Sequence, residues 1–334
     1  MLIIGCVLIA YMKNNSFINM IKQNVNAAAE RIKKHVILTP FERSAMVSDL
    51  TGADVWLKME NQQHTGSFKF RGAMNKMLTL SESERESGIY AASTGNHGAA
   101  VAYACQKLHV PCIIYVPENS SDAKLANMKN FGAEIRVHGK DCMDGELKAR
   151  EVADSTGGIY LSPYNDPDVI SGQGTIGLEI ESQCSVLDAV IVSVGGGGLI
   201  SGVGGYLKSV WPDIEVIAAS PENHAVMIKS LEAGQIIKID PVPTISDGTA
   251  GGVENGSVTF EMCQEYVDQM VLLTEQEIQE GIIHLIEKER ILVEGAAGTS
   301  IAALIRMKDQ LKGKRVGIIV CGRNISLEVL RKIL

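Results

Sequence analysis

Lys69 is the residue of this chain best placed for covalent chemistry, because its neighbours would favour the neutral amine. The segment Thr65–Ala73 reads Thr-Gly-Ser-Phe-Lys-Phe-Arg-Gly-Ala, so the lysine lies between two phenylalanines, just after a Gly-Ser break. Ser67 is a suitable N-cap for a helix that begins here. The helix dipole and the apolar rings would both disfavour the ammonium form. A neutral lysine amine can attack a carbonyl and form a Schiff base. A surface lysine at a helix start is the alternative that this segment alone leaves open.

Four consecutive glycines, Gly195–Gly198, follow the apolar segment 189–194 and precede Leu199 and a helix-like stretch. Glycines let several backbone N–H groups approach an anion closely, and a helix N-terminus would add to the attraction. The spacing fits neither G-x-G-x-x-G nor the P-loop pattern, which disfavours a dinucleotide or an ATP site. The segment therefore predicts a phosphate site. The alternative is a glycine-rich connection without a ligand.

A polar turn lies between a predicted strand at 89–92 and a predicted helix at 98–108. It consists of Ser93, Thr94, Gly95, Asn96, His97 and Gly98. Two hydroxyls, an amide and the free N–H groups of a helix N-terminus can bind a carboxylate. The histidine considered alone is more often structural than catalytic.

Short apolar segments alternate with amphipathic ones through most of the chain, which predicts parallel βαβ units. Strands are predicted at 54–60, 89–92, 112–116, 134–137, 189–194, 215–219 and 315–320. Helices are predicted at 19–34, 98–108, 123–131, 145–156, from after 175 to 183, at 274–289 and at 298–307. The expected fold class is therefore α/β.

Composition narrows the function further. The chain has 334 residues and a net charge of −8, which argues against nucleic acid or an anionic membrane as its main partner. Its seven cysteines include no C-x-x-C pair, and this pattern fits a reducing cytoplasm better than a disulfide framework. The apolar run Leu2–Ala10 is too short to span a bilayer. We hypothesise that translation starts at Met12 and that residues 1–11 are absent from the native protein.

Together, the lysine segment, the glycine loop and the polar turn resemble the fold-type II pyridoxal-phosphate enzymes. The similarity is closest to the threonine dehydratase and serine racemase family, including its hydroxyectoine-utilisation dehydratase-like branch. It extends from about Ile32 to the C-terminus. The motifs that carry it are GSFKFRGA at 66–73, STGNHG at 93–98, GGGGL at 195–199, SDGTAGG at 246–252 and CGRNIS at 321–326.

The resemblance implies a role for each matching residue. Lys69 would carry pyridoxal 5'-phosphate as a Schiff base, with Phe68 beside it, and would act as the catalytic base. Asn96 would contact the ring hydroxyl of the cofactor, and Cys321 would contact its pyridine nitrogen. The cofactor phosphate would be bound by Gly195, Gly196, Gly197, Gly198 and Leu199. The substrate carboxylate would be bound by Ser93, Thr94, Gly95 and His97, and Thr94 would also be catalytic. A thiol at the pyridine nitrogen leaves the ring unprotonated, which favours elimination.

The implied reaction is β-elimination, converting L-threonine to 2-oxobutanoate and ammonia, or L-serine to pyruvate. The alternatives are a serine racemase, an eliminase on another 3-hydroxy amino acid, and a catalytically inactive ligand-binding homologue. Racemases of the family have serine where this chain has Thr94, which weakens the racemase reading. The family usually has glycine at the position of Arg323. Crowding of the cofactor site by this arginine is the basis for the alternative of a catalytically inactive homologue. The segment 220–226 has only Glu222 as a carboxylate, so no metal is assigned.

The resemblance also implies an architecture like that of the tryptophan synthase β subunit, with two three-layer αβα domains whose open sheets are mostly parallel. Residues 1–87 and 165–334 would form a large cofactor-binding domain. Residues 88–164 would form a small mobile domain that carries the asparagine turn and closes over the substrate. We expect a cytoplasmic homodimer that acts on a small amino acid.

Overall fold

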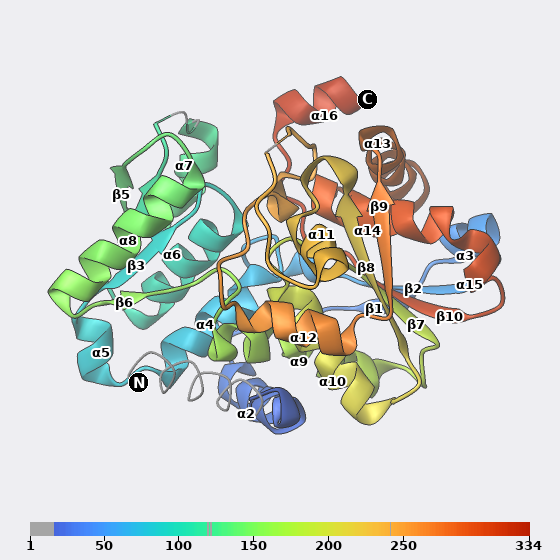
Figure 1. Ribbon diagram of the computed structural model, residues 1–334, viewed down its shortest axis with the longest axis horizontal. Coiled ribbons are helices and arrows are strands. Elements are labelled where there is room, and N and C mark those ends of the chain that lie inside the picture. Colours follow the sequence, from blue (N-terminus) through green and yellow to red (C-terminus); the bar gives the residue numbers. More distant parts are fainter. Residues whose placement is uncertain (1–16, 119, 121, 241) are drawn as a thin grey trace.

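The computed structural model describes residues 17–334 except 119, 121 and 241, and these residues form two open sheets with helices packed around them (Figure 1). The hypothesis that translation starts at Met12 lies outside the described residues. In Figure 1 the smaller sheet and its helices lie on the left and the larger sheet lies on the right. The predicted α/β class, with open and mostly parallel sheets, is confirmed.

The described residues form a large sheet of six strands whose centre is buried. Only β1 runs antiparallel to its neighbour, while every other pair is parallel. The central strands β10 and β7 are almost wholly apolar and lie inside the main hydrophobic core, as expected for a parallel sheet covered on both faces. In spatial order the strands are β1 (Phe41–Arg43), β2 (Asp54–Lys58), β10 (Arg315–Ile319), β7 (Ala189–Ser193), β8 (Glu215–Pro221) and β9 (Gln269–Leu273).

A second sheet of four parallel strands is built from one continuous stretch of the described chain. Its central strand β3 is buried along its whole length. The spatial order is β5 (Glu134–Val137), β4 (Cys112–Val116), β3 (Ile89–Ala92) and β6 (Ile159–Tyr160). The sheets therefore use separate parts of the chain, 89–160 for the small one and both flanking parts for the large one. The division into two domains at 87/88 and 164/165, and the mobility of the smaller one, remain predictions.

The helices cover the faces of these sheets. Those around the small sheet are α5 (Glu82–Glu86), α6 (Asn96–Leu108), α7 (Asp122–Asn130) and α8 (Cys142–Thr156). The others are α2 (Ile21–Ile32), α3 (Ala45–Thr51), α4 (Lys69–Thr79), α9 (Pro167–Gln183), α10 (Gly198–Val210), α11 (Val226–Ala233), α12 (Val258–Tyr266), α13 (Glu275–His284), α14 (Gly295–Arg306), α15 (Lys308–Leu311) and α16 (Leu327–Ile333). A π-helical turn, Leu285–Glu289, continues α13. No helix among the described residues is both long and apolar enough to cross a lipid bilayer.

Helix α9 begins nine residues before the predicted start, so that prediction is wrong. Asp166 caps the helix by accepting hydrogen bonds from the N–H groups of Asp168 and Val169, and Pro167 occupies the first turn. Gly172 and Gly174, which precede the predicted start, lie inside the helix. A Cβ on Gly172 would lie 2.7 Å from a backbone atom of α4, and one on Gly174 would lie 2.4 Å from a side chain of α2. The glycines therefore allow close helix packing.

A buried ion network fixes the helix that carries Lys69. Arg71 is fully buried, with its guanidinium 2.8 Å from the Glu60 carboxylate and 2.6 Å from the Glu179 carboxylate. The Lys58 ammonium lies 2.5 Å from the second oxygen of Glu179. Two cations thus balance two carboxylates, which is the condition for tolerating buried charge. The network ties α4 to β2 and to α9.

Candidate active site

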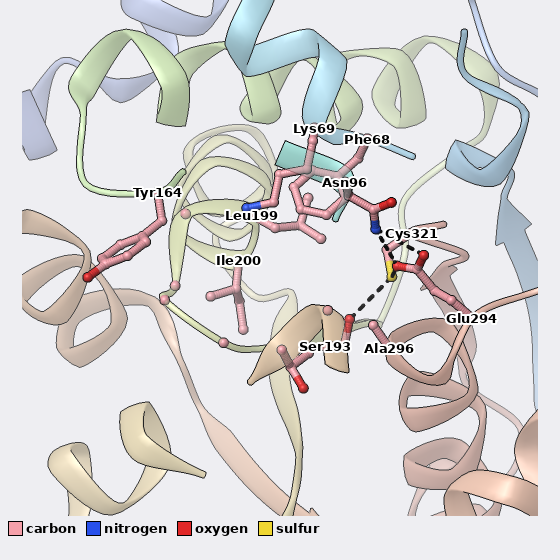
Figure 2. A pocket seen from close by; sticks show the side chains of 16 residues that line it. Phe68, Lys69, Asn96, Tyr164, Ser193, Leu199, Ile200, Glu294, Ala296 and Cys321 are labelled. Carbon is pink, nitrogen blue, oxygen red and sulfur yellow. Dashed lines mark hydrogen bonds between the residues drawn. The ribbon is translucent and has the colours of Figure 1, made fainter. Parts of the chain in front are cut away.

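The site is a cavity at the carboxyl ends of the central strands of the large sheet, where parallel α/β sheets usually bind ligands. Strand β7 leads into the glycine loop, β10 leads into Cys321, and α4 and α6 begin beside them. Figure 2 shows side chains from these elements gathered around one space. The lining residues are Phe68, Lys69, Asn96, Tyr164, Ser193, Gly195, Gly196, Gly197, Gly198, Leu199, Ile200, Gly248, Thr249, Glu294, Ala296 and Cys321.

The structure starts α4 at Lys69 itself, and its N-cap is Phe68, so the prediction that Ser67 is the N-cap is wrong. Ser67 instead forms an isolated antiparallel bridge with Gly322, and its hydroxyl is buried without a partner among the described residues. The N–H of Phe68 donates to the carbonyl of Cys321 at 3.0 Å. This pairing holds the backbone extended through Ser67, so the helix begins later and places Lys69 in its first turn.

The amine of Lys69 is poised to lose its proton. Burial lowers its pKa to about 8, although Cys321 and Glu294 partly oppose that shift. The Nζ atom donates to the carbonyl of Pro163 at 2.8 Å and lies 5.2 Å from the centre of the Phe68 ring. Phe70 points away into the hydrophobic core around the small sheet, so only one of the two flanking phenylalanines borders the amine. A helix N-terminus and burial thus act together on Lys69, as its sequence context suggests.

The glycine loop is shaped to hold an anion. Within the described chain, the backbone N–H groups of Gly195–Gly198 have no hydrogen-bond acceptor, and α10 begins at the last of them. A Cβ on Gly195 would lie 2.6 Å from the Thr249 carbonyl, and one on Gly196 would lie 2.4 Å from the Tyr164 ring. Gly197 has φ +86°, in the left-handed region. Free N–H groups at a helix N-terminus fit a phosphate, and they fit the phosphate of pyridoxal 5'-phosphate.

Cys321 lies just after β10, on the opposite side of the cavity from Tyr164 (Figure 2). Its thiol is 1% exposed and accepts a hydrogen bond from the Ser193 hydroxyl at 3.6 Å. Burial and the neighbouring Glu294 raise the pKa of the thiol, so Cys321 stays neutral at physiological pH. A neutral thiol beside a hydroxyl suits an unprotonated pyridine nitrogen.

Glu294 is a functional candidate that the sequence reasoning missed. It is 3% exposed, and its carboxylate accepts two hydrogen bonds from the Asn96 amide, at 2.8 and 2.9 Å (Figure 2). The amide of Asn324 donates to the Asn96 oxygen at 2.6 Å, which fixes the orientation of Asn96. Burial raises the pKa of Glu294 to about 7. A helix that starts at residue 298, as predicted, does not include Glu294 in its first turn. The observed start at Gly295 makes Glu294 the N-cap residue, but its side chain makes no capping hydrogen bond and instead accepts from Asn96.

The rest of the polar turn lies beside the cavity lining. Of its residues only Asn96 contributes to the lining, while Ser93, Thr94 and Gly95 lie directly before it. His97 is buried, with Nε2 2.9 Å from the Leu161 carbonyl, and burial lowers the pKa of its ring to about 3. Its side chain therefore faces the protein interior, and only its backbone N–H remains for a ligand. The substrate-binding roles of these residues remain predictions.

Arg323 lies outside the cavity lining. The residue is exposed, its N–H donates to the Gly66 carbonyl at 2.9 Å, and its side chain passes over Gly66. The argument from Arg323 for an inactive protein therefore loses its basis, because the side chain does not obstruct the cavity. The described residues contain no group of three or more His, Cys, Asp or Glu side chains placed to hold a metal ion.

Comparisons with known proteins agree with this geometry. Residues 32–322 match the model of the family described as pyridoxal-phosphate dependent enzyme. The chain is 40% identical to an L-threonine ammonia-lyase of Thermotoga maritima, over 93% of this chain and 77% of that protein. It is 37% identical to an L-threo-3-hydroxyaspartate ammonia-lyase of Saccharomyces cerevisiae, over 90% and 92%.

Among solved structures, maize serine racemase superimposes with a TM-score of 0.88 at 31% identity, covering 93% of this chain and 95% of that one. The similar proteins thus catalyse different reactions on small amino acids, and the ammonia-lyases among them support an enzyme of the lyase type. The family match covers most of the chain and includes the lysine, the glycine loop and the buried thiol described above. The chain therefore belongs to the pyridoxal-phosphate dependent enzymes of fold type II.

Proposed function

We propose that this protein is a threonine and serine dehydratase, which converts L-threonine to 2-oxobutanoate and ammonia, and L-serine to pyruvate and ammonia. The observation that carries the proposal is the state of Lys69. Its amine is held against the Pro163 carbonyl in the cavity with a pKa of about 8. Such an amine can both hold the cofactor and, once released from it, accept a proton from the substrate.

In this proposal each residue has a defined task. Pyridoxal phosphate, when bound, supplies the aldehyde that holds the substrate amine and a ring that draws electrons from Cα. The N–H groups of Gly195–Gly198 hold its phosphate, and Asn96 orients its ring hydroxyl. Lys69 Nζ removes the Cα proton, and the β-hydroxyl leaves as water after it takes up a proton. Hydrolysis of the resulting 2-aminoalkenoate, which consumes one water, gives the 2-oxo acid and ammonia. The turn 93–95 and the N–H of His97 receive the substrate carboxylate.

The buried thiol supports elimination over reactions that need a full carbanion. Cys321 stays protonated and neutral, since burial raises its pKa. It therefore offers no negative charge that would hold a proton on the pyridine nitrogen, and the ring remains a moderate electron sink. Loss of the β-hydroxyl then competes well with reprotonation of Cα.

The proposal is tested by incubating the purified holoenzyme with L-threonine. Ammonia and 2-oxobutanoate should form in equal amounts, and the remaining threonine should keep its configuration at Cα. Formation of D-serine from L-serine, without pyruvate, would support a racemase instead. The absence of oxo acid from both amino acids would contradict the proposed reaction.

Thr94 should limit racemisation, because its methyl group displaces the hydroxyl that a serine would offer to the second face of Cα. Replacing Thr94 by Ser should raise the ratio of racemisation to elimination with L-serine, by about tenfold for the ~1.4 kcal/mol that one well-placed hydrogen bond supplies. Chiral chromatography of the serine pool, together with a pyruvate assay, measures the ratio. An unchanged ratio would show that the residue has no such role.

Capture of pyridoxal phosphate by the enzyme without cofactor should depend on pH through Lys69. Only the neutral amine attacks the aldehyde, and the neutral fraction grows as pH rises through the pKa of the amine. Because that pKa is about 8, the capture rate should rise with a midpoint near that value and then level off. Stopped-flow absorbance between mildly acidic and strongly alkaline pH records the profile. A rate that keeps rising to the ordinary lysine pKa of 10.5 would mean that burial does not activate the amine.

We further propose a cytoplasmic homodimer whose 88–164 region moves as a small domain. The described cysteines are all free thiols, which supports a reducing compartment. The cavity is lined by Asn96 of α6, beside the small sheet, as well as by residues that follow strands of the large sheet, and this supports domain closure over the substrate. Light scattering of the purified protein tests the dimer.

A further inference from the structure

A cluster of polar side chains adjoins the cavity on the side to which the Lys69 amine points. Glu146 and Arg150 come from α8, Tyr160 ends β6, and Glu254 precedes α12. These four residues are called here the Glu146 cluster. Tyr164 links them to the site, because it lines the cavity and its hydroxyl accepts the N–H of Glu254 at 2.9 Å. In Figure 2, the Lys69 nitrogen points towards the Tyr164 side and away from Cys321.

The only cation of the cluster is already engaged. Arg150 donates to Glu254 Oε2 at 2.8 Å, and its guanidinium carbon lies 4.1 Å from the centre of the Tyr160 ring. This pair joins α8 to the segment before α12, so it also fixes the two walls of the cluster relative to each other. Arg150 therefore neutralises one carboxylate and has no free charge for a second.

Two buried polar atoms of the cluster have no hydrogen-bond partner in the described chain. The Tyr160 hydroxyl and Glu254 Oε1 are buried and make no hydrogen bond. Glu146 interacts with its surroundings only through burial and charge, and burial raises its pKa to about 7, with Glu254 adding to the shift while Arg150 and Lys69 oppose it. Buried polar groups are nearly always satisfied in native proteins, so these two atoms, beside the partly buried Glu146 carboxyl, point to a missing ligand.

Resting on the β-elimination proposed at Lys69, we propose that the Glu146 cluster binds the end of the substrate side chain beyond Cβ, and that it selects a 3-hydroxy-2-amino acid bearing a second ammonium group. A representative of this class is 2,4-diamino-3-hydroxybutanoate. An ammonium has three donors, which match the carboxylate of Glu146, the free oxygen of Glu254 and the hydroxyl of Tyr160.

The same cluster disfavours an acidic side chain. With Glu146 ionised, two carboxylates face one guanidinium, and a substrate carboxylate would add a third negative charge to the cluster. L-threo-3-hydroxyaspartate, the substrate in the name of one similar enzyme, is therefore expected to be a poor substrate here. L-threonine and L-serine fit the site but leave the cluster unfilled.

The test compares substrates in the holoenzyme and in a Glu146→Gln variant, which keeps the size of the side chain and removes its charge. In the wild type, kcat/KM for 2,4-diamino-3-hydroxybutanoate should exceed that for L-threonine by about tenfold or more. In the variant, the ratio of these two values should fall by about 10- to 100-fold, as expected for the loss of a charge-assisted hydrogen bond. Glu151→Gln is the matched control, since Glu151 lies on the same helix but pairs with Lys148 at the surface. In Glu151→Gln, the ratio of kcat/KM for the diamino acid to kcat/KM for L-threonine should equal that of the wild type.

A binding measurement separates the subsite from the reaction. L-2,4-diaminobutanoate and L-norvaline have side chains of equal length and no β-hydroxyl, so neither can lose water. The first should bind the holoenzyme about tenfold more tightly than the second, by the change in its visible spectrum, and Glu146→Gln should remove the difference. Equal binding of the two ligands to the wild type would overturn the subsite, whatever the enzyme does with L-threonine. Tighter binding of the diamino acid without oxo acid from any substrate would keep the subsite and overturn the dehydratase reaction.

Discussion

Replacing Lys69 by Ala should lower kcat for L-threonine by at least about 10³-fold, because one change removes both the cofactor anchor and the base. The amine donates to the Pro163 carbonyl and is the only cation among the residues that line the described cavity. No neighbouring group can therefore replace it. The measurement is 2-oxobutanoate formation with saturating pyridoxal phosphate, since weak cofactor binding alone could otherwise cause the loss.

A matched lysine shows whether the effect is specific. Lys107 on α6 is exposed and packs against the Tyr103 ring, away from the cavity. Replacing Lys107 by Ala should leave kcat within about twofold of the wild type, since surface substitutions of this kind have small effects. Activity in the Lys69→Ala variant comparable to that of Lys107→Ala would remove Lys69 from the mechanism.

The second large effect concerns stability. Replacing Arg71 by Met should lower the free energy of unfolding by about 3–5 kcal/mol, because it leaves the carboxylates of Glu60 and Glu179 in the interior with one cation fewer. Glu60 is fully buried, so it cannot recover hydration when its partner is lost. Urea unfolding of the cofactor-loaded protein, followed by circular dichroism, measures the change.

An exposed arginine gives the comparison. Arg136 pairs with Glu134 at the surface, where the two side chains are 45% and 57% exposed. Replacing Arg136 by Met should change the free energy of unfolding by less than about 1 kcal/mol. If the two variants lose similar amounts of stability, the buried network contributes no more than a surface pair, and another feature must fix α4.

The sequence was most informative where a local pattern decides the structure. The apolar segments 189–194 and 315–320 could be read as buried strands, because continuous apolar runs suit the centre of a parallel sheet. The glycine loop could be placed at the end of the first strand, since four successive glycines serve little purpose in a strand or helix interior. Strand β9 was missed, because Gln269–Leu273 is a short edge strand without clear bounds in the sequence.

Pairings between distant residues could not be predicted from one sequence. Asn96 and Glu294 lie 198 positions apart, and only the folded chain brings the amide onto the carboxylate. The inward direction of His97 likewise depends on the Leu161 carbonyl, 64 positions away. Local context predicts Ser67 as an N-cap, but its long-range bridge to Gly322 overrides that preference. Tertiary contacts therefore decided the details of the site, while local patterns decided its position.

The central claim, that Lys69 carries the cofactor and yields it to the substrate, is tested most directly by borohydride reduction and peptide mass spectrometry. Reduction of the resting holoenzyme should fix the cofactor covalently to the peptide that contains Lys69. Reduction during turnover of L-threonine should leave most of that peptide unlabelled, because the substrate amine then holds the cofactor. Label on another lysine, or on Lys69 to the same extent with and without L-threonine, would contradict the account.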